Sequence, residues 1–256
     1  MKLHLTAMAA LAVAASPLQA APEVPEGKVM IDPAAEAVLL DVCAWLRQAP
    51  SFSVHADISF DEITSDGTRI EYHRQDLVAL SRPDKLRIEI EDDRGRRSVY
   101  YDGKQMTLYR PANRVYAQVK APDNLDAALD LAESEGIEMP MDDLLYSHPC
   151  AGIAENLRTG TYGGLHFLDG DLYHHLLLTT DAVDVQLWVA NDEVPTIRKA
   201  VIAYSGEVGT PLYRAFFSDW NFAPGITDDI FHFEPAEGDR QIPFRSDATD
   251  RKEAEK

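Results

Sequence analysis

A two-residue period dominates the chain and limits what it can fold into. In the segment 52–60, apolar residues such as Phe52 and Val54 alternate with polar ones such as Ser53 and Asp57. Successive side chains of a β-strand point to opposite faces, so this alternation predicts a strand with one buried face. The pattern returns in short segments separated by turns rich in Gly, Pro and Asp. This favours an antiparallel meander over alternating strand–helix units.

The alternation predicts six strands before an interruption and a further set of strands after it. They fall at 52–60, 69–81, 86–90, 98–101, 105–109 and 114–119, and then near 164–167, 173–180, 183–189, 197–204, 212–222 and 230–233. A strongly twisted sheet of this width must curl or close, because open sheets of this kind rarely exceed about 10 strands.

Two helical regions are available to cover the apolar face of such a sheet. In the first, Asp32 is a good N-cap, Pro33 suits the first helical position, and apolar residues recur at helical spacing as far as Leu46. The second region, 123–156, interrupts the strands. We expect Asp123 to cap a helix there, followed by a shorter helical piece.

The first residues of the chain predict export. Residues 1–21 combine Lys2 with an apolar stretch and the small residues Ala20 and Ala21, which is typical of a cleaved signal peptide. No cysteine occupies a lipoprotein position, and no later apolar run reaches the roughly 18 residues of a membrane span. We therefore expect a periplasmic, soluble protein without a membrane anchor. Its parts are a flexible segment at 22–31, one domain at 32–244 and a disordered tail at 245–256.

Cys43 and Cys150 are the only two cysteines of the chain. In an oxidising compartment they are candidates for an internal disulfide. The alternative is two separately buried thiols that act as small apolar side chains. The sequence leaves both open.

Charge and motifs exclude several functions. The chain has 24 Lys and Arg against 43 Asp and Glu, a net charge of −19, which disfavours binding to nucleic acid. None of the common hydrolase, phosphate-loop or dithiol motifs occurs, so we predict no enzyme, no catalytic residues, no metal and no cofactor. The pair His174 and His175 is the most tempting exception. Neighbours on a strand face opposite ways, so we expect one buried and one exposed histidine instead of a metal site.

Several segments together resemble one family. They are SFSVHADISFDEI, RPDKLRIEIED, YYDGKQMTLYRPANRVYAQV, VDVQLWVANDEVPTIRKAVIAY and FSDWNFAPGITDDIFHFEPAEGDRQI, in that order after a leader and an amphipathic helix. Over roughly residues 33–243 the chain resembles the periplasmic lipoprotein-carrier (LolA/LolB-like) superfamily. It looks most similar to an uncharacterised, predicted-periplasmic branch of it.

The resemblance implies a mainly β (α+β) fold. A strongly curved antiparallel sheet of about 10–11 strands would form an unclosed barrel, with helices plugging its concave face and a helical insert at 123–156. In the carriers this face holds acyl chains. The residues expected to line such an apolar cavity are Trp45, Leu46, Phe52, Val54, Ile58, Phe60, Leu86, Ile88, Ile90, Val185 and Leu187.

The function that follows is a monomeric periplasmic carrier for a lipid, a lipoprotein acyl chain or another apolar ligand. Its partners would be a lipid or lipidated protein, and a periplasmic or membrane protein. The alternative is a non-enzymatic envelope sensor or protein-interaction module that uses the same fold. The acidic surface suits a soluble carrier, because acids on outward strand positions, helix caps and turns keep an exported protein well solvated.

Overall fold

A computed structural model describes residues 30–137 and 142–244 of the 256-residue chain. The predicted leader at 1–21, nearly all of the segment 22–31 and the tail at 245–256 lie outside the described residues. The two residues of 22–31 that are described, Met30 and Ile31, form a short strand, where the sequence predicted a flexible segment.

The described residues form one mixed sheet of 13 strands that does not close into a barrel. The strands are β1 (Met30–Ile31), β2 (Ser51–Ile63), β3 (Arg69–Ser81), β4 (Lys85–Asp92), β5 (Gly95–Tyr101), β6 (Gln105–Arg110), β7 (Val115–Lys120), β8 (Thr159–Leu168), β9 (Asp171–Thr179), β10 (Asp184–Ala190), β11 (Ile197–Ala203), β12 (Leu212–Asn221) and β13 (Arg240–Ile242). Their order in the sheet is β1-β8-β9-β10-β11-β12-β2-β3-β4-β5-β6-β7-β13.

The sheet confirms the predicted unclosed half-barrel. Strands β2 to β7 and β8 to β12 occupy the predicted positions and pair antiparallel with their neighbours. The two additional strands are short and parallel: β1 pairs with β8, and β13 pairs with β7. One predicted strand is wrong. Residues 230–233 overlap the 3-10 helix η3 (Asp228–Phe231), in which Phe231 is buried, so they form no part of the sheet.

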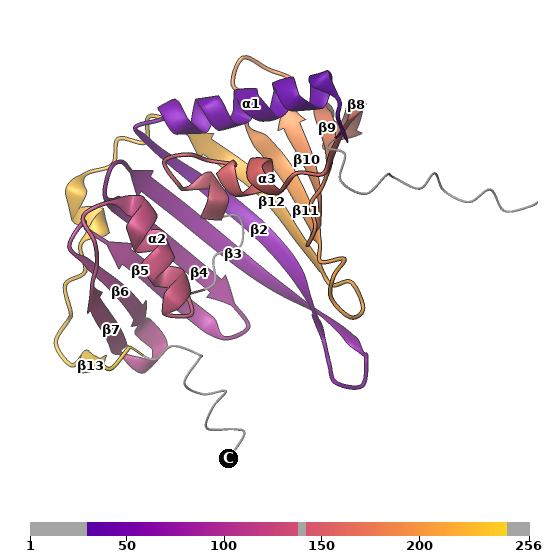
Figure 1. Cartoon of the computed structure of the whole chain (residues 1–256). Helices are drawn as coiled ribbons and strands as arrows, with labels where there is room; N and C mark the ends of the chain where they lie inside the picture. Colours follow the sequence, from indigo (N-terminus) through magenta and orange to yellow (C-terminus); the bar gives the residue numbers. More distant parts are fainter. Residues whose placement is uncertain (1–29, 138–141, 245–256) are drawn as a thin grey trace, which may run out of the picture.

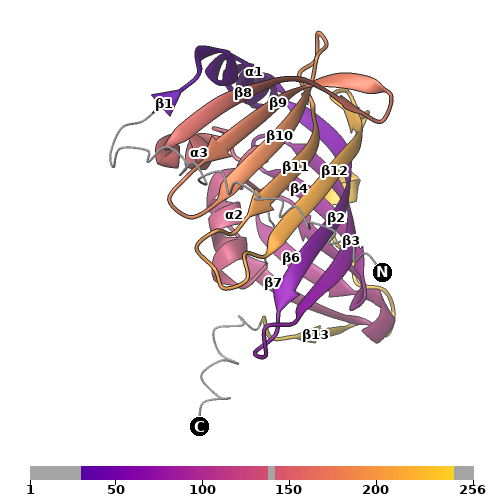
Figure 2. The ribbon, with the colours of Figure 1, turned by 90° about the vertical axis from the view of Figure 1, so that its right-hand side faces the viewer.

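Three helices and a 3-10 turn lie on the concave side of the sheet. They are α1 (Pro33–Gln48), α2 (Leu125–Ser134), α3 (Ala151–Asn156) and the turn η2 (Asp142–Leu144). A further 3-10 turn, η1 (Pro111–Asn113), connects β6 to β7. Figure 1 shows α1 across one end of the curled sheet and α2 and α3 in front of its strands. Figure 2 shows that the two edges of the sheet stay apart.

Local sequence explains where the helices begin. Asp32 caps α1 as predicted, since its carboxylate accepts a hydrogen bond of 2.9 Å from the Ala34 amide. The second cap is Asn124, which accepts from the Ala127 amide at 2.9 Å, whereas the sequence predicted Asp123. The apolar faces of both helices, including Leu39 on α1 and Leu129 on α2, join the inward residues of the strands in one core.

The chain after β12 crosses the outer face of the sheet. There Phe233 packs among Tyr100, Tyr109 and Tyr116, with ring centroids 5.0–5.4 Å apart. Tyr100 alternates along β5 with the buried Val99 and so belongs to the outer side. This C-terminal segment ends beside β7 and covers that edge of the sheet.

A disulfide joins α1 to the helical insert. Cys43 and Cys150 are bonded in the structure, with their Cα atoms 6.0 Å apart and a separation of 107 positions in the sequence. Of the two alternatives that the sequence left open, the structure contains the bridge. Cys150 directly precedes α3, so the bond ties the insert to the helix that covers the end of the sheet.

We expect the double variant Cys43→Ser/Cys150→Ser to fold but to lose stability. In the chain-entropy account, a bridge across about 100 residues contributes up to roughly 4.7 kcal/mol, and measured values are typically about 2–4 kcal/mol. Urea unfolding followed by circular dichroism measures the loss. Wild-type protein treated with a dithiol reductant should unfold at the same urea concentration as the variant. An unchanged midpoint for both would contradict a structural bridge.

Candidate functional site

The concave face holds a small, largely apolar cavity. Its volume is about 50 Å³. The lining comes from β2, β3, β4, β12 and the insert: Phe52, Val54, Ala56, Ile58, Arg74, Asp76, Val78, Ile88, Asp142, Leu144, Leu145, Tyr213, Phe217 and Trp220. An engineered cavity of about 150 Å³ is known to hold benzene, so the present space is too small for an acyl chain.

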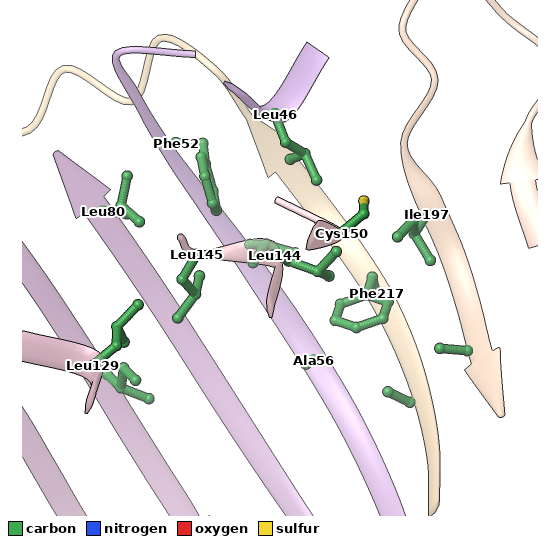
Figure 3. Close-up of a cluster of buried hydrophobic side chains, with 14 of the residues drawn as sticks. Leu46, Phe52, Ala56, Leu80, Leu129, Leu144, Leu145, Cys150, Ile197 and Phe217 are labelled. Atoms are coloured by element: carbon green, nitrogen blue, oxygen red, sulfur yellow. The ribbon is translucent and has the colours of Figure 1, made fainter. Parts of the chain in front are cut away.

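Two leucines of the insert pack against the concave face at this point. Leu144 and Leu145 are buried, at 4% and 7% exposure. Figure 3 shows them over β2, between Phe52 on one side and Phe217 on the other. We call Leu144 and Leu145 the plug, because they occupy the space that the curved sheet would otherwise leave open.

In addition to this apolar packing, polar contacts and the disulfide hold the plug in place. Arg82, at the end of β3, donates hydrogen bonds of 3.0 Å to the carbonyl oxygens of both Leu145 and Tyr146. The Ser147 amide donates to Asp126 of α2 at 2.8 Å, and the Tyr146 hydroxyl donates to Asp130 at 2.9 Å. Contacts of this kind can be broken and replaced by water, at a net cost of about 1 kcal/mol each.

One end of the cavity is polar. Arg74 and Asp76 of β3 both face inward and form an ion pair, in which Arg74 Nε donates to Asp76 Oδ1 at 2.6 Å. Burial lowers the pKa of Arg74, but the hydrogen bond and charge of Asp76 outweigh it and raise the pKa overall. Tyr213 of β12 lies beside this pair, and burial raises its pKa, so its hydroxyl stays protonated.

A wider cleft opens at this polar end. It has a volume of about 490 Å³ and shares Ile58, Arg74, Asp142 and Tyr213 with the cavity. Its remaining lining comes from the far end of β2, from α2 and from the loop between β11 and β12: Phe60, Asp61, Glu133, Ile137, Tyr204, Glu207, Pro211 and Leu212. The four shared residues place the cavity at the inner end of the cleft.

Asp142 stands where the cavity and the cleft meet. Burial raises its pKa from 3.8 to about 6, and the negative charges of Asp143 and Glu133 add to the effect. Burial likewise raises the pKa of Asp143. The structure places Asp142 in the lining of both spaces.

The predicted lining residues divide into three groups. Phe52, Val54, Ile58 and Ile88 line the cavity, and Phe60 lines the cleft. Leu46, Leu86, Ile90, Val185 and Leu187 are buried in the core and line neither space. Trp45 is 37% exposed and packs edge-on against Phe222 at 5.8 Å, at the rim of the fold.

Sequence reasoning missed the polar residues and the plug. The position of Arg74 and Asp76 depends on the register of β3 on β2, in which Ile58 lies opposite Arg74 and Ala56 opposite Asp76. Cross-strand partners lie on the same face of a sheet, so the two charged residues lie on the concave face beside the apolar residues of β2. For Leu144 and Leu145 there was no signal in the sequence, since their position depends on Arg82 and the disulfide.

The histidine pair lies away from the cavity. His175 is buried on the outer face and stacks on Trp188 at 4.2 Å, and burial lowers its pKa. His174 is half-buried and its Nδ1 lies 2.7 Å from the Tyr162 hydroxyl. Within residues 30–137 and 142–244, no three His, Cys, Asp or Glu side chains are grouped to hold a metal ion.

Comparison with protein families identifies a relative of the whole domain. Residues 35–245 match the model of a family described as a predicted periplasmic protein, DUF2092. The chain belongs to this family. The assignment confirms the predicted-periplasmic branch that the sequence segments suggested. Comparison with curated proteins gives no match.

Several solved structures are similar over most of their length. An uncharacterised conserved protein from Thermus thermophilus has 9% identity and a TM-score of 0.47, covering 82% of this chain and 99% of that one. LprF from Mycobacterium bovis has 15% identity and a TM-score of 0.46, covering 80% of this chain and 98% of that one. A LolA superfamily protein from Nitrosomonas europaea has 15% identity and a TM-score of 0.36, covering 78% of this chain and 97% of that one.

The helices in the described part of the chain include none that is both long and apolar enough to span a membrane.

We expect Asp142→Asn to stabilise the protein at neutral pH. The pKa of Asp142 is higher in the folded state than its ordinary value of 3.8, so the folded state binds the proton more tightly. Its contribution to stability is therefore greatest below about pH 4 and is lost as the pH rises through about 6. Because Asp142 is partly exposed, we expect the free energy of unfolding of the variant at pH 7 to rise by only on the order of 1 kcal/mol.

Urea unfolding between pH 4 and pH 8 measures this effect. The matched control is Asp93→Asn, which removes the same charge from an exposed turn. If both variants change stability equally across the pH range, the net charge of the protein explains the result and the burial of Asp142 does not.

Proposed function

We propose that the protein is a non-catalytic carrier for a lipid, a lipoprotein acyl chain or another apolar ligand, and that it acts in the periplasm. The observation that carries the proposal is the apolar cavity under the plug, with an open cleft leading to it. The apolar chain of the ligand would lie along β2, β3, β4 and β12, in the space that Leu144 and Leu145 now fill.

Loading then requires the plug to move. The apolar cavity wall contributes the binding energy, at about 25 cal/mol for each Å² of apolar surface removed from water. Moving the plug exposes two leucines and breaks the hydrogen bonds of Arg82. The incoming chain replaces the leucines against the same wall, so the exchange conserves most of the buried apolar contact.

Mass spectrometry of organic extracts tests the proposal directly. Protein purified from the periplasm should release acyl-bearing species in amounts comparable to the protein itself. The delipidated protein should take up a fluorescent fatty-acid probe and melt at a lower temperature than the loaded form. Absence of both extractable lipid and probe uptake would contradict a carrier. Capture of a periplasmic protein by the lipid-free form would instead support the interaction module.

We expect Arg82→Met to bind the probe more tightly than wild type. Methionine keeps an apolar stem of similar length, but it cannot donate to the Leu145 and Tyr146 carbonyls. The open state of the plug then becomes more populated, and the apparent Kd falls in proportion to that population. Loss of two hydrogen bonds of about 1 kcal/mol each corresponds to a change of roughly tenfold or more.

The neighbouring strand offers a matched control. Arg87 donates to a backbone carbonyl in the same way, to Ile230 at 3.1 Å, but on the outer face of the sheet. Arg87→Met should leave the probe affinity unchanged. Equal effects of the two variants would show that general destabilisation, and not release of the plug, governs uptake.

A further inference from the structure

The outer cleft has a polar lining that an acyl chain does not need. A ligand chain in the cavity would have its head group in the cleft, because the two spaces meet at Ile58, Arg74, Asp142 and Tyr213. The chemistry of the cleft therefore selects the head group. This inference rests on the proposed carrier function and extends it to the class of lipid.

Most of the positive charge in the cleft is already used. The guanidinium of Arg74 is paired with Asp76. Asp61, which also lines the cleft, binds Arg69 and Arg214 and accepts a hydrogen bond of 3.0 Å from the Leu212 amide. These charges therefore largely cancel within the protein and leave little net attraction for an anionic head group.

Three acids of the cleft have no cationic partner among the described residues. They are Glu133 of α2, Asp142 of η2 and Glu207 of the β11–β12 loop, and none of them forms an ion pair in that part of the chain. Glu133 and Glu207 are exposed at the rim, and Asp142 is half-buried further in. They come from three separate elements and surround one space, so a positive group in the cleft would face all three.

Tyr213 supplies an unused hydrogen-bond donor beside them. The residue is only 4% exposed and lines both the cavity and the cleft. No hydrogen bond joins its hydroxyl to another described residue. The hydroxyl therefore remains available to donate to a ligand oxygen at the point where the cavity meets the cleft. Phe60 and Tyr204 add aromatic surface of the kind that favours contact with an ammonium group.

We propose that the cleft binds the head group of a zwitterionic lipid. Its ammonium group would face Glu133, Asp142 and Glu207, and an oxygen next to the acyl chain would accept the hydrogen bond of Tyr213. Phosphoethanolamine lipids have this arrangement of charges. An anionic head group without the ammonium would leave the three acids unpaired and would be repelled by them.

Two probes with the same acyl chain separate the lipid class from the carrier function. They are lysophosphatidylethanolamine and lysophosphatidylglycerol, titrated below their micelle concentrations into the delipidated full chain by calorimetry at low salt and pH 8. We expect the ethanolamine lipid to bind at least tenfold more tightly. The difference should shrink as salt is raised, since exposed charges are screened within about 10 Å at 0.1 M salt.

Variants identify the residues responsible. Glu133→Gln/Glu207→Gln should bring the ratio of the two affinities toward one, whereas Glu36→Gln/Glu155→Gln removes two exposed acids elsewhere and should leave it unchanged. Tyr213→Phe should weaken both lipids severalfold and leave their ratio intact.

The outcomes are distinct. Equal affinities, or tighter binding of the glycerol lipid, would overturn the head-group inference and leave the carrier function standing. If neither lipid binds and the fatty-acid probe is not taken up, the proposed function itself fails. If the ratio of the two lipid affinities changes equally in both double variants, the net charge of the protein causes the preference for the ethanolamine lipid. That result would overturn the role of the cleft.

Discussion

A curved apolar sheet face that does not close on itself has to be kept from water, and the other elements of this protein are arranged around that need. Helix α1 covers one end of the concave face, α2 covers the strands near β5 and β6, and the plug, Leu144 and Leu145, covers the middle. Each cover is attached differently. The first two are packed helices, whereas the plug, which also packs in the core, is held in addition by Arg82, Asp126 and the nearby disulfide. That difference makes the plug the element best suited to exchange with a ligand.

Local periodicity was enough to predict most of the sheet. Strands β2 to β12 alternate apolar and polar residues or lie between clear turns, and this signal does not depend on distant contacts. The short strands β1 and β13 could not be predicted from this periodicity. Two or three residues have no measurable period, and β1 owes its place to main-chain bonds such as Met30 N to the Arg158 carbonyl at 3.0 Å. Residues 230–233 alternate like a strand, yet Phe231 turns inward and Phe233 packs on three tyrosines, so tertiary contacts decide their conformation.

The candidate site was predictable only on its apolar side. The alternation of β2 and β4 was sufficient to select Phe52, Val54, Ile58 and Ile88. The same signal in β10 also selected Leu187 and Val185, because inward residues look alike whether they line a space or pack against a helix. Arg74 and Asp76 were hidden for a different reason. The run Leu77 to Leu80 interrupts the period of β3, so its inward face is defined only by its register with β2.

The disulfide at Cys150 has a consequence for how tightly any ligand is held. Because the bond keeps the insert attached to α1, a displaced plug would stay close to the cavity and compete for it from within the same molecule. An intramolecular competitor acts at a high effective concentration, which its tether fixes and which dilution of the protein does not change. The observed association constant of the ligand would then be its association constant for an empty cavity, divided by about the equilibrium constant with which the plug occupies that cavity. Release of the ligand would need no other molecule to refill the space.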